Sequence, residues 1–168
     1  MQSILSAIRH ALKQKNWHAA LFISMTLPDI CCALEFGSSD GQKYAQWFDN
    51  NLPTYNGFLS GNDCYALRCS LLHEGKDDIT EQKRREVLDH VLFLTCTSHL
   101  NVFKDCIIDG VAESFVQLNV GSFCEDFCLT TENWLKAHLE NRAIQGRLDN
   151  TIRIHGPGYI YKRAIKFE

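Results

Sequence analysis

The run from Trp17 to Phe36 constrains the fold most, because it is apolar nearly all round. A helix without a polar face has to be buried, so this run predicts a central helix with other elements packed around it. Pro28 removes a backbone donor and clashes with the preceding turn. We therefore expect a kink or a restart there, with Thr26 as a cap and Gly37 as the stop.

A membrane span is not expected from this run. Its most apolar part, Ala19 to Leu34, is interrupted by Pro28 and Asp29 and is shorter than a membrane span requires. The N-terminal segment does not suit a signal peptide, because basic side chains interrupt its apolar pattern: Arg9, His10, Lys13 and Lys15. We therefore predict a cytoplasmic protein with no membrane association.

The composition sets further bounds. The chain has 168 residues, 45% of them hydrophobic, which predicts one domain with a single core. A net charge of −3 excludes global attraction to nucleic acid, so RNA binding would need a local basic patch. The eight cysteines are interpreted as reduced thiols. Cys124 and Cys128 share helical spacing but lack a second Cys/His pair, so we expect no metal and no cofactor.

Amphipathic helices are predicted on both sides of the central run. They cover residues 3 to 17, residues 38 to about 51, and residues 122 to about 141. Aromatic residues at helical spacing in these segments are interpreted as core rather than as base-stacking groups: Tyr44, Trp47, Phe48 and Trp134.

Between the helices, three runs of β-branched and aromatic residues predict two or three short antiparallel strands. They are Val91 to Thr97, Val102 to Ile108 and Phe115 to Val120, and Asp109-Gly110 is a hairpin-turn signal. A helix through Glu81 to Leu94 is the competing interpretation of the first run. The predicted fold is mainly α, a helical bundle over residues 1–141 with a small antiparallel β insertion at about residues 88–120. Residues 142–168 form a C-terminal tail, interpreted as extended.

The segment Gly61 to Gly75, GNDCYALRCSLLHEG, predicts one short helix with unusual residues inside it. Ser60 or Asn62 would cap it. Arg68 and His73 are five residues apart, which is about 140° around a helix. The two side chains therefore do not share one face, and a joint site forms more easily where two copies of the helix meet in a twofold homodimer.

This pair suits metal-free RNA cleavage. A histidine can take the proton from a ribose 2′-hydroxyl or give one to the leaving oxygen, and an arginine fork can hold the phosphate. His73 also lies near the helix C-terminus, where the helix dipole favours the protonated ring. The structural alternative is that Arg68 pairs with Asp63 or Glu74 and that His73 caps the helix.

Two neighbouring features bear on this site. The charged run Lys76 to Glu86 is either a solvated loop or a phosphate-contacting edge, which would use Lys83, Arg84 and Arg85 to bind RNA. Asp29 lies in the apolar central run, where a buried carboxylate needs a partner, and Arg68 is a reasonable one. Alternatively, Asp29 marks a helix cap or an exposed position.

The pattern around these residues resembles the HEPN superfamily (higher eukaryotes and prokaryotes nucleotide-binding domains), whose hallmark is an R-x4-6-H motif late in a bundle helix. The resemblance covers roughly residues 1–141 through LPDICCALE, YAQWFDNNL and GNDCYALRCSLLHEG. Many members are metal-independent endoribonucleases that act as toxins or defence effectors, with a site composed across a homodimer.

The resemblance implies that Arg68 and His73 are the catalytic pair. The residue after the motif arginine is commonly polar in active members, and here it is Cys69. Either other side chains supply the polar contact or the protein is a non-catalytic module that binds a nucleotide, RNA or a protein partner. The supporting candidates are Asp63, Tyr65, Ser70 and Glu74. The resemblance also implies a nucleotidyltransferase-like antitoxin as a partner.

Overall fold

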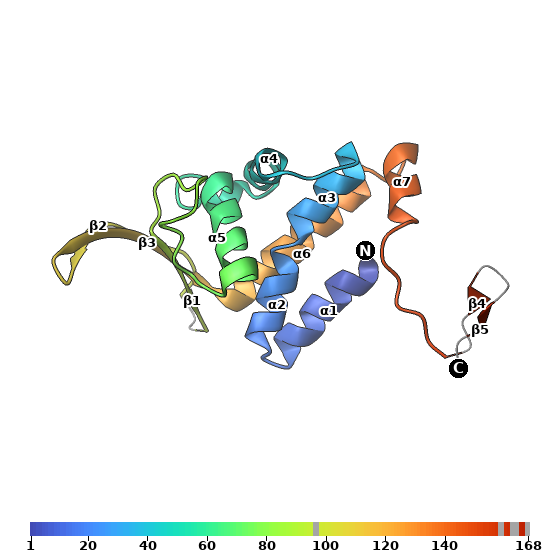
Figure 1. Ribbon diagram of the computed structural model, residues 1–168, viewed down its shortest axis with the longest axis horizontal. Coiled ribbons are helices and arrows are strands. Elements are labelled where there is room, and N and C mark those ends of the chain that lie inside the picture. Colours follow the sequence, from blue (N-terminus) through green and yellow to red (C-terminus); the bar gives the residue numbers. More distant parts are fainter. Residues whose placement is uncertain (96–97, 158–159, 162–164, 167–168) are drawn as a thin grey trace.

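The computed structural model describes residues 1–95, 98–157, 160–161 and 165–166. A helical body lies next to a small sheet whose hairpin projects away from it (Figure 1). The helices are α1 (Gln2–Lys13), α2 (Trp17–Ser24), α3 (Leu27–Phe36), α4 (Gly41–Asn51), the 3-10 helix η1 (Pro53–Tyr55), α5 (Gly61–Glu74), α6 (Val120–Ala137) and α7 (Arg142–Leu148). The strands are β1 (His90–Leu94), β2 (Asn101–Ile108), β3 (Val111–Asn119), β4 (Ile160–Tyr161) and β5 (Ile165–Lys166).

The apolar run forms two helices, as its proline predicts. The helix is interrupted between α2 and α3, where Thr26 precedes α3 and Pro28 lies in its first turn. The Thr26 hydroxyl donates back to the Ile23 carbonyl oxygen and makes no capping hydrogen bond to α3. Gly37 ends α3 in the left-handed conformation, with φ of 79°, which costs glycine little. By length and composition alone, Trp17–Phe36 would qualify as a membrane span, and half of its most apolar window is buried inside the fold.

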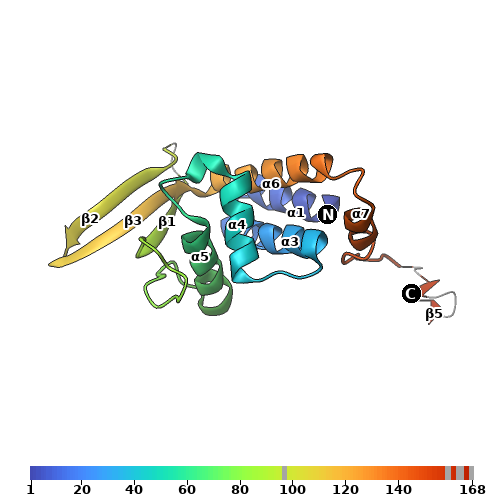
Figure 2. The ribbon, with the colours of Figure 1, turned by 90° about the horizontal axis from the view of Figure 1, so that it is seen from above.

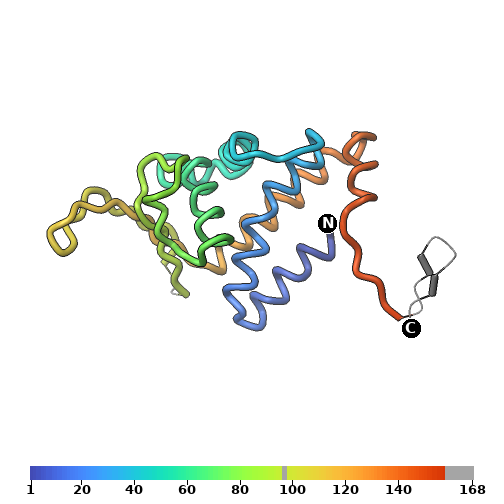
Figure 3. The backbone as a smooth tube through the Cα atoms, viewed as in Figure 1, coloured from blue at the N-terminus to red at the C-terminus, as the bar shows by residue number. Residues whose placement is uncertain are grey.

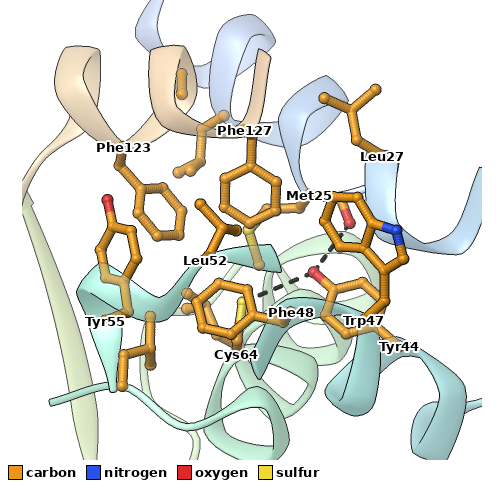
Figure 4. Packing of buried hydrophobic residues seen from close by; sticks show 14 of the residues in the cluster. Met25, Leu27, Tyr44, Trp47, Phe48, Leu52, Tyr55, Cys64, Phe123 and Phe127 are labelled. Atoms are coloured by element: carbon orange, nitrogen blue, oxygen red, sulfur yellow. Dashed lines mark hydrogen bonds between the residues drawn. The ribbon is translucent and has the colours of Figure 1, made fainter. Parts of the chain in front are cut away.

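The core lies where α6 meets α2, α3 and α4. Phe123 and Phe127 of α6 point toward the aromatic side chains of α4 and η1 (Figure 4). The rings of Phe48 and Phe127 are 5.9 Å apart between centroids, and those of Tyr55 and Phe123 are 5.5 Å apart. The four aromatic residues that we interpreted as core are confirmed as buried: Tyr44, Trp47, Phe48 and Trp134.

The sheet has the strand order β1-β3-β2. Strands β2 and β3 form the antiparallel hairpin that the Asp109-Gly110 signal predicts, and both turn residues have positive φ, 51° and 84°. Strand β1 pairs with β3 in parallel, with His90 opposite Phe115. Figure 2 shows the hairpin extending well beyond the helices.

The predicted mainly α fold with an antiparallel insertion is wrong, because the protein is a mixed α/β structure with a three-stranded mixed sheet. The competing helix over Glu81 to Leu94 is also wrong, since β1 occupies its end. Val91, Val116 and Leu118 are fully buried in the same core as α6. The β-branched and aromatic runs correctly predicted strands. The parallel pairing of β1 with β3 depends on the path of the chain through β2, so no local sequence pattern indicates it.

The C-terminal segment departs from its prediction too. Residues 142–148 form α7 rather than an extended tail, and Asn141 caps this helix through its side chain. Arg147 donates from Nη1 to the carbonyl oxygens of Leu34, at 2.8 Å, and of Glu35, at 3.1 Å. This binds α7 to the C-terminal end of α3, after which the chain leaves the helical body (Figure 3).

Candidate active site on helix α5

Helix α5 has the predicted start and stop. The Ser60 side chain accepts a hydrogen bond from the Asp63 amide at 3.0 Å, and Gly75 ends the helix with φ of 69°. The helix starts directly against α4: a Cβ at Gly61 would lie 2.1 Å from the Ala45 carbonyl oxygen. Gly61 therefore permits a backbone approach that no other residue would allow, and this fixes the position of α5.

Arg68 and His73 meet within one chain. Arg68 Nη1 lies 3.4 Å from His73 Nε2, and His73 is exposed in the last turn of α5. The expectation that the angular offset makes them poor partners in a single chain is therefore wrong. The arginine side chain is long enough to reach across the helix surface, so one copy already brings a phosphate-binding group beside a proton-transfer group.

Asp29 of α3 holds Arg68 in place. Arg68 Nε donates to Asp29 Oδ2 at 3.0 Å, and the Ser39 hydroxyl donates to Asp29 Oδ1 at 2.6 Å. This confirms the predicted partner and rules out Asp63 and Glu74 in that role. Burial disfavours the charge on Arg68, but attraction to Asp29 and interaction with the adjacent Cys69 together outweigh it, so the pKa of Arg68 is raised above its ordinary value. The guanidinium therefore stays charged and oriented.

Tyr65, Cys69 and His73 form a stripe along α5, because each is four residues from the next. The centroid of the Tyr65 ring lies 6.0 Å from Cζ of Arg68 and 6.0 Å from Cζ of Arg84. Burial, and then the adjacent Cys69 thiol, raise the pKa of Tyr65 above its ordinary value. A neutral aromatic ring therefore lies close to two guanidinium groups.

The other supporting candidates hold the loop of residues 75–89 instead of facing the Arg68/His73 pair. Asp63 is 2% exposed and accepts from the Glu86 amide at 2.7 Å, while the Ser70 hydroxyl donates to the Asp78 carbonyl at 2.6 Å. Burial raises the pKa of Asp63 against the effect of its backbone donors. Glu74 accepts from the side chains of Lys76 and Gln82.

The three cations predicted to bind RNA have different surroundings. Lys83 and Arg84 line a pocket with Tyr65 and Cys69. Arg85 instead forms an ion pair with Asp89, four residues on, and it does not line that pocket. The basic run is thus an exposed loop, and two of its three neighbouring cations border the α5 stripe.

The described part of the chain shows no metal-binding cluster. It contains no group of three or more His, Cys, Asp or Glu side chains placed to hold a metal ion. The cysteines in it are free thiols: Cys31, Cys32, Cys64, Cys69, Cys106, Cys124 and Cys128. Helix α5 therefore places the His73 imidazole beside the Arg68 guanidinium, which Asp29 holds in place.

Comparison of the chain with protein-family models, with curated proteins and with solved structures gives no match. The resemblance to the HEPN superfamily therefore stays a prediction based on the R-x4-H motif and the residues around it. Two parts of the site lacked a sequence signal. Ser39 lies ten residues from Asp29, and the Arg84–Tyr65 contact depends on how the loop folds back over α5.

Proposed function

We propose that the protein is a metal-independent endoribonuclease of the HEPN type, with His73 as the acid/base group and Arg68 as the phosphate clamp. The observation that carries the proposal is the Arg68–His73 contact of 3.4 Å, with Arg68 fixed from behind by Asp29. Because Asp29 engages Nε, the outer nitrogens of the guanidinium stay directed toward His73 and toward a phosphate.

The proposed reaction is an internal displacement. A neutral imidazole accepts the proton of the ribose 2′-hydroxyl, and the 2′-oxygen attacks the adjacent phosphorus. The bond from phosphorus to the 5′-oxygen breaks, and that oxygen receives a proton from an imidazolium. The products are a 2′,3′-cyclic phosphate and a free 5′-hydroxyl. Arg68 offsets the charge on the phosphoryl oxygens during the transfer.

This chemistry favours a homodimer. Base and acid act on opposite sides of the phosphorus, whereas one chain offers a single histidine at this position. Two copies related by a twofold axis through the exposed side of α5 would supply a neutral and a protonated His73 to one cleft. We further propose a cytoplasmic toxin or defence effector that a nucleotidyltransferase-like antitoxin restrains.

Incubation of RNA with purified protein in EDTA tests the proposal. Wild type should give products with 2′,3′-cyclic phosphate ends, and His73→Ala should lower the rate by about 100-fold or more. His10→Ala is the matched control, because His10 is exposed on α1, away from the site. Cleavage that survives His73→Ala would remove His73 from the mechanism.

Cys69 favours a second candidate function, a non-catalytic module that binds RNA or a nucleotide. It follows Arg68 directly and lines the pocket as a half-buried thiol, where an active enzyme of this type commonly has a stronger hydrogen-bonding group. RNA binding without cleavage by wild type, together with growth unaffected by its expression, would support this candidate over the ribonuclease.

A further inference from the structure

A pocket of about 460 Å³ opens between α5 and the loop of residues 75–89, beside the Arg68/His73 pair. Its size is within the range of sites for small molecules or single nucleotides. Helix α5 contributes an aromatic ring, a thiol and the Glu74 carboxylate, which accepts a hydrogen bond from Gln82 in the opposite wall. The loop contributes Glu81, Gln82, Lys83 and Arg84, which face Tyr65 and Cys69.

The Tyr65 ring is held as a platform in this pocket. It packs edge-on against the buried Tyr44, with centroids 5.3 Å apart. Arg84 lies against the same ring, and its Nη1 donates weakly to Asn62 Oδ1 at 3.5 Å. A Cβ at Gly41 would come within 2.6 Å of both Arg84 Nε and Tyr65 Cε1, so the bare glycine makes room for this arrangement.

Arg84 is charged but has no carboxylate partner. Among the described residues, no Asp or Glu oxygen lies within ion-pair distance of its guanidinium; its neighbour Arg85, in contrast, is paired with Asp89. An unpaired guanidinium beside an aromatic ring matches the two needs of a nucleotide, a cation for phosphate and a surface on which the base can stack.

The pocket and the Arg68/His73 pair lie along one line. Tyr65 and His73 are eight residues apart on the same stripe of α5, about 12 Å along the helix axis. An RNA strand with a phosphate at Arg68 and His73 would therefore run over the pocket with a neighbouring nucleotide. Oxygens of Glu81 and Gln82 in the wall accept hydrogen bonds, so they can meet amino groups on a base edge.

We propose that this pocket binds one nucleotide of single-stranded RNA next to the cleaved bond, with the base on Tyr65 and its phosphate at Arg84. The inference rests on the proposed function for its substrate, RNA. Tyr65 and Arg84 thereby act in binding and sequence preference, whereas Arg68 and His73 act on the bond itself.

Binding to a labelled single-stranded oligoribonucleotide, measured by fluorescence anisotropy in the His73→Ala background, separates recognition from cleavage. Arg84→Ala should raise Kd roughly tenfold and reduce the salt slope of log Kd by about 1. Arg85→Ala is the matched control, because it removes the same charge from the adjacent residue outside the pocket. Equal weakening by both variants would overturn the proposal, since it would indicate general charge attraction.

Tyr65 provides the second comparison. Tyr65→Ala should raise Kd roughly 5- to 100-fold through lost stacking, and Tyr65→Phe should bind as tightly as the parent. Because Phe keeps the packing on Tyr44, it controls for folding, and melting curves of both variants complete the check. Unchanged binding by a folded Tyr65→Ala would overturn the proposal.

The two proposals fail separately. If wild type cleaves RNA through His73 but the Tyr65 and Arg84 variants bind like the parent, the pocket assignment is wrong and the ribonuclease stands. If these variants lose binding while wild type cleaves nothing, the pocket stands and the ribonuclease assignment is wrong. If no variant and no wild type binds the oligonucleotide, the pocket assignment is wrong as well.

Discussion

Two arginines, each bound by carboxylates, have very different surroundings. Arg9 of α1 uses Nε and both Nη nitrogens to bind Glu125 and Glu132 of α6, with distances such as 2.7 Å from Nη2 to Glu125. Arg68 has one carboxylate hydrogen bond within the described residues, from Nε to Asp29. All three nitrogens of the first guanidinium bind carboxylates, whereas only Nε of the second does, and its Nη1 lies 3.4 Å from His73 Nε2.

The difference separates a structural role from a functional one. The Arg9 group connects two helices, and four of its five N–H donors bind carboxylates. The Arg68 group is held firmly on one side and is available on the other, as expected for a phosphate clamp. Charge and partial burial alone do not distinguish them, since both have a raised pKa to which carboxylates contribute. What distinguishes them is the number of donors that remain.

The largest expected effect comes from Arg68→Lys. It keeps the positive charge and removes the planar fork that binds Asp29 and a phosphate together, so we expect kcat for RNA cleavage to fall about 100-fold. The melting temperature should stay close to wild type. Full activity in Arg68→Lys would show that a positive charge alone suffices for cleavage. It would contradict the assignment of the Arg68 fork as a phosphate clamp.

Asp29→Asn should have a smaller effect on activity. The amide oxygen can still accept a hydrogen bond, but the charge that orients Arg68 is lost, and we expect kcat to fall about tenfold with little change in KM. Steady-state cleavage rates at several RNA concentrations separate these constants. An equal loss of stability and activity would instead assign Asp29 to the fold only.

Arg9→Ala should lower the free energy of unfolding by about 1–2 kcal/mol, because the network is partly exposed and screened by solvent. Urea denaturation monitored by circular dichroism measures this change. The rate of RNA cleavage per folded molecule should not change. A loss of cleavage rate in well-folded Arg9→Ala would contradict its purely structural assignment.

The loss of unfolding free energy in Arg9→Ala should depend on pH. We expect this pH dependence to be the smallest effect of the series. The Arg9 hydrogen bond lowers the pKa of Glu132 below its ordinary value of 4.5. A lowered folded pKa contributes stability that is present above the ordinary pKa and is lost as the pH falls through the folded one. The difference between wild type and Arg9→Ala should therefore shrink as the pH falls below 4.5. An unchanged difference would show that charge pairing is not its source.

The sequence predicted local structure better than pairing. Ser60 caps α5, and Gly37 and Gly75 end their helices as expected, because caps and left-handed glycines depend on a few adjacent residues. Thr26 lies at the start of α3 as expected, but its side chain makes no capping hydrogen bond. The parallel pairing of β1 with β3 was missed, since register and direction depend on the whole chain path. Helix α7 was missed because its contact, Arg147 on the end of α3, joins residues far apart in sequence.

The candidate site shows the same division. The Asp29 partner of Arg68 follows from residue type, since a carboxylate in an apolar run needs a counter-ion. The choice of Arg68 and His73 rests on the R-x4-H motif and the resemblance around it. The offset of about 140° favoured a joint site between two copies over the reach of the arginine, whereas the contact forms within one chain. Asp63 and Ser70 instead form hydrogen bonds with the loop of residues 75–89. These contacts depend on how the loop folds, so the sequence does not indicate them.

The most direct measurement compares RNA cleavage by Arg68→Ala and Arg9→Ala in EDTA, with the folded fraction of each variant determined in the same buffer. We expect folded Arg68→Ala to lose about 100-fold or more in rate, and Arg9→Ala to cleave at the wild-type rate per folded molecule. Retained cleavage in Arg68→Ala, or equal loss in both variants, would contradict this expectation.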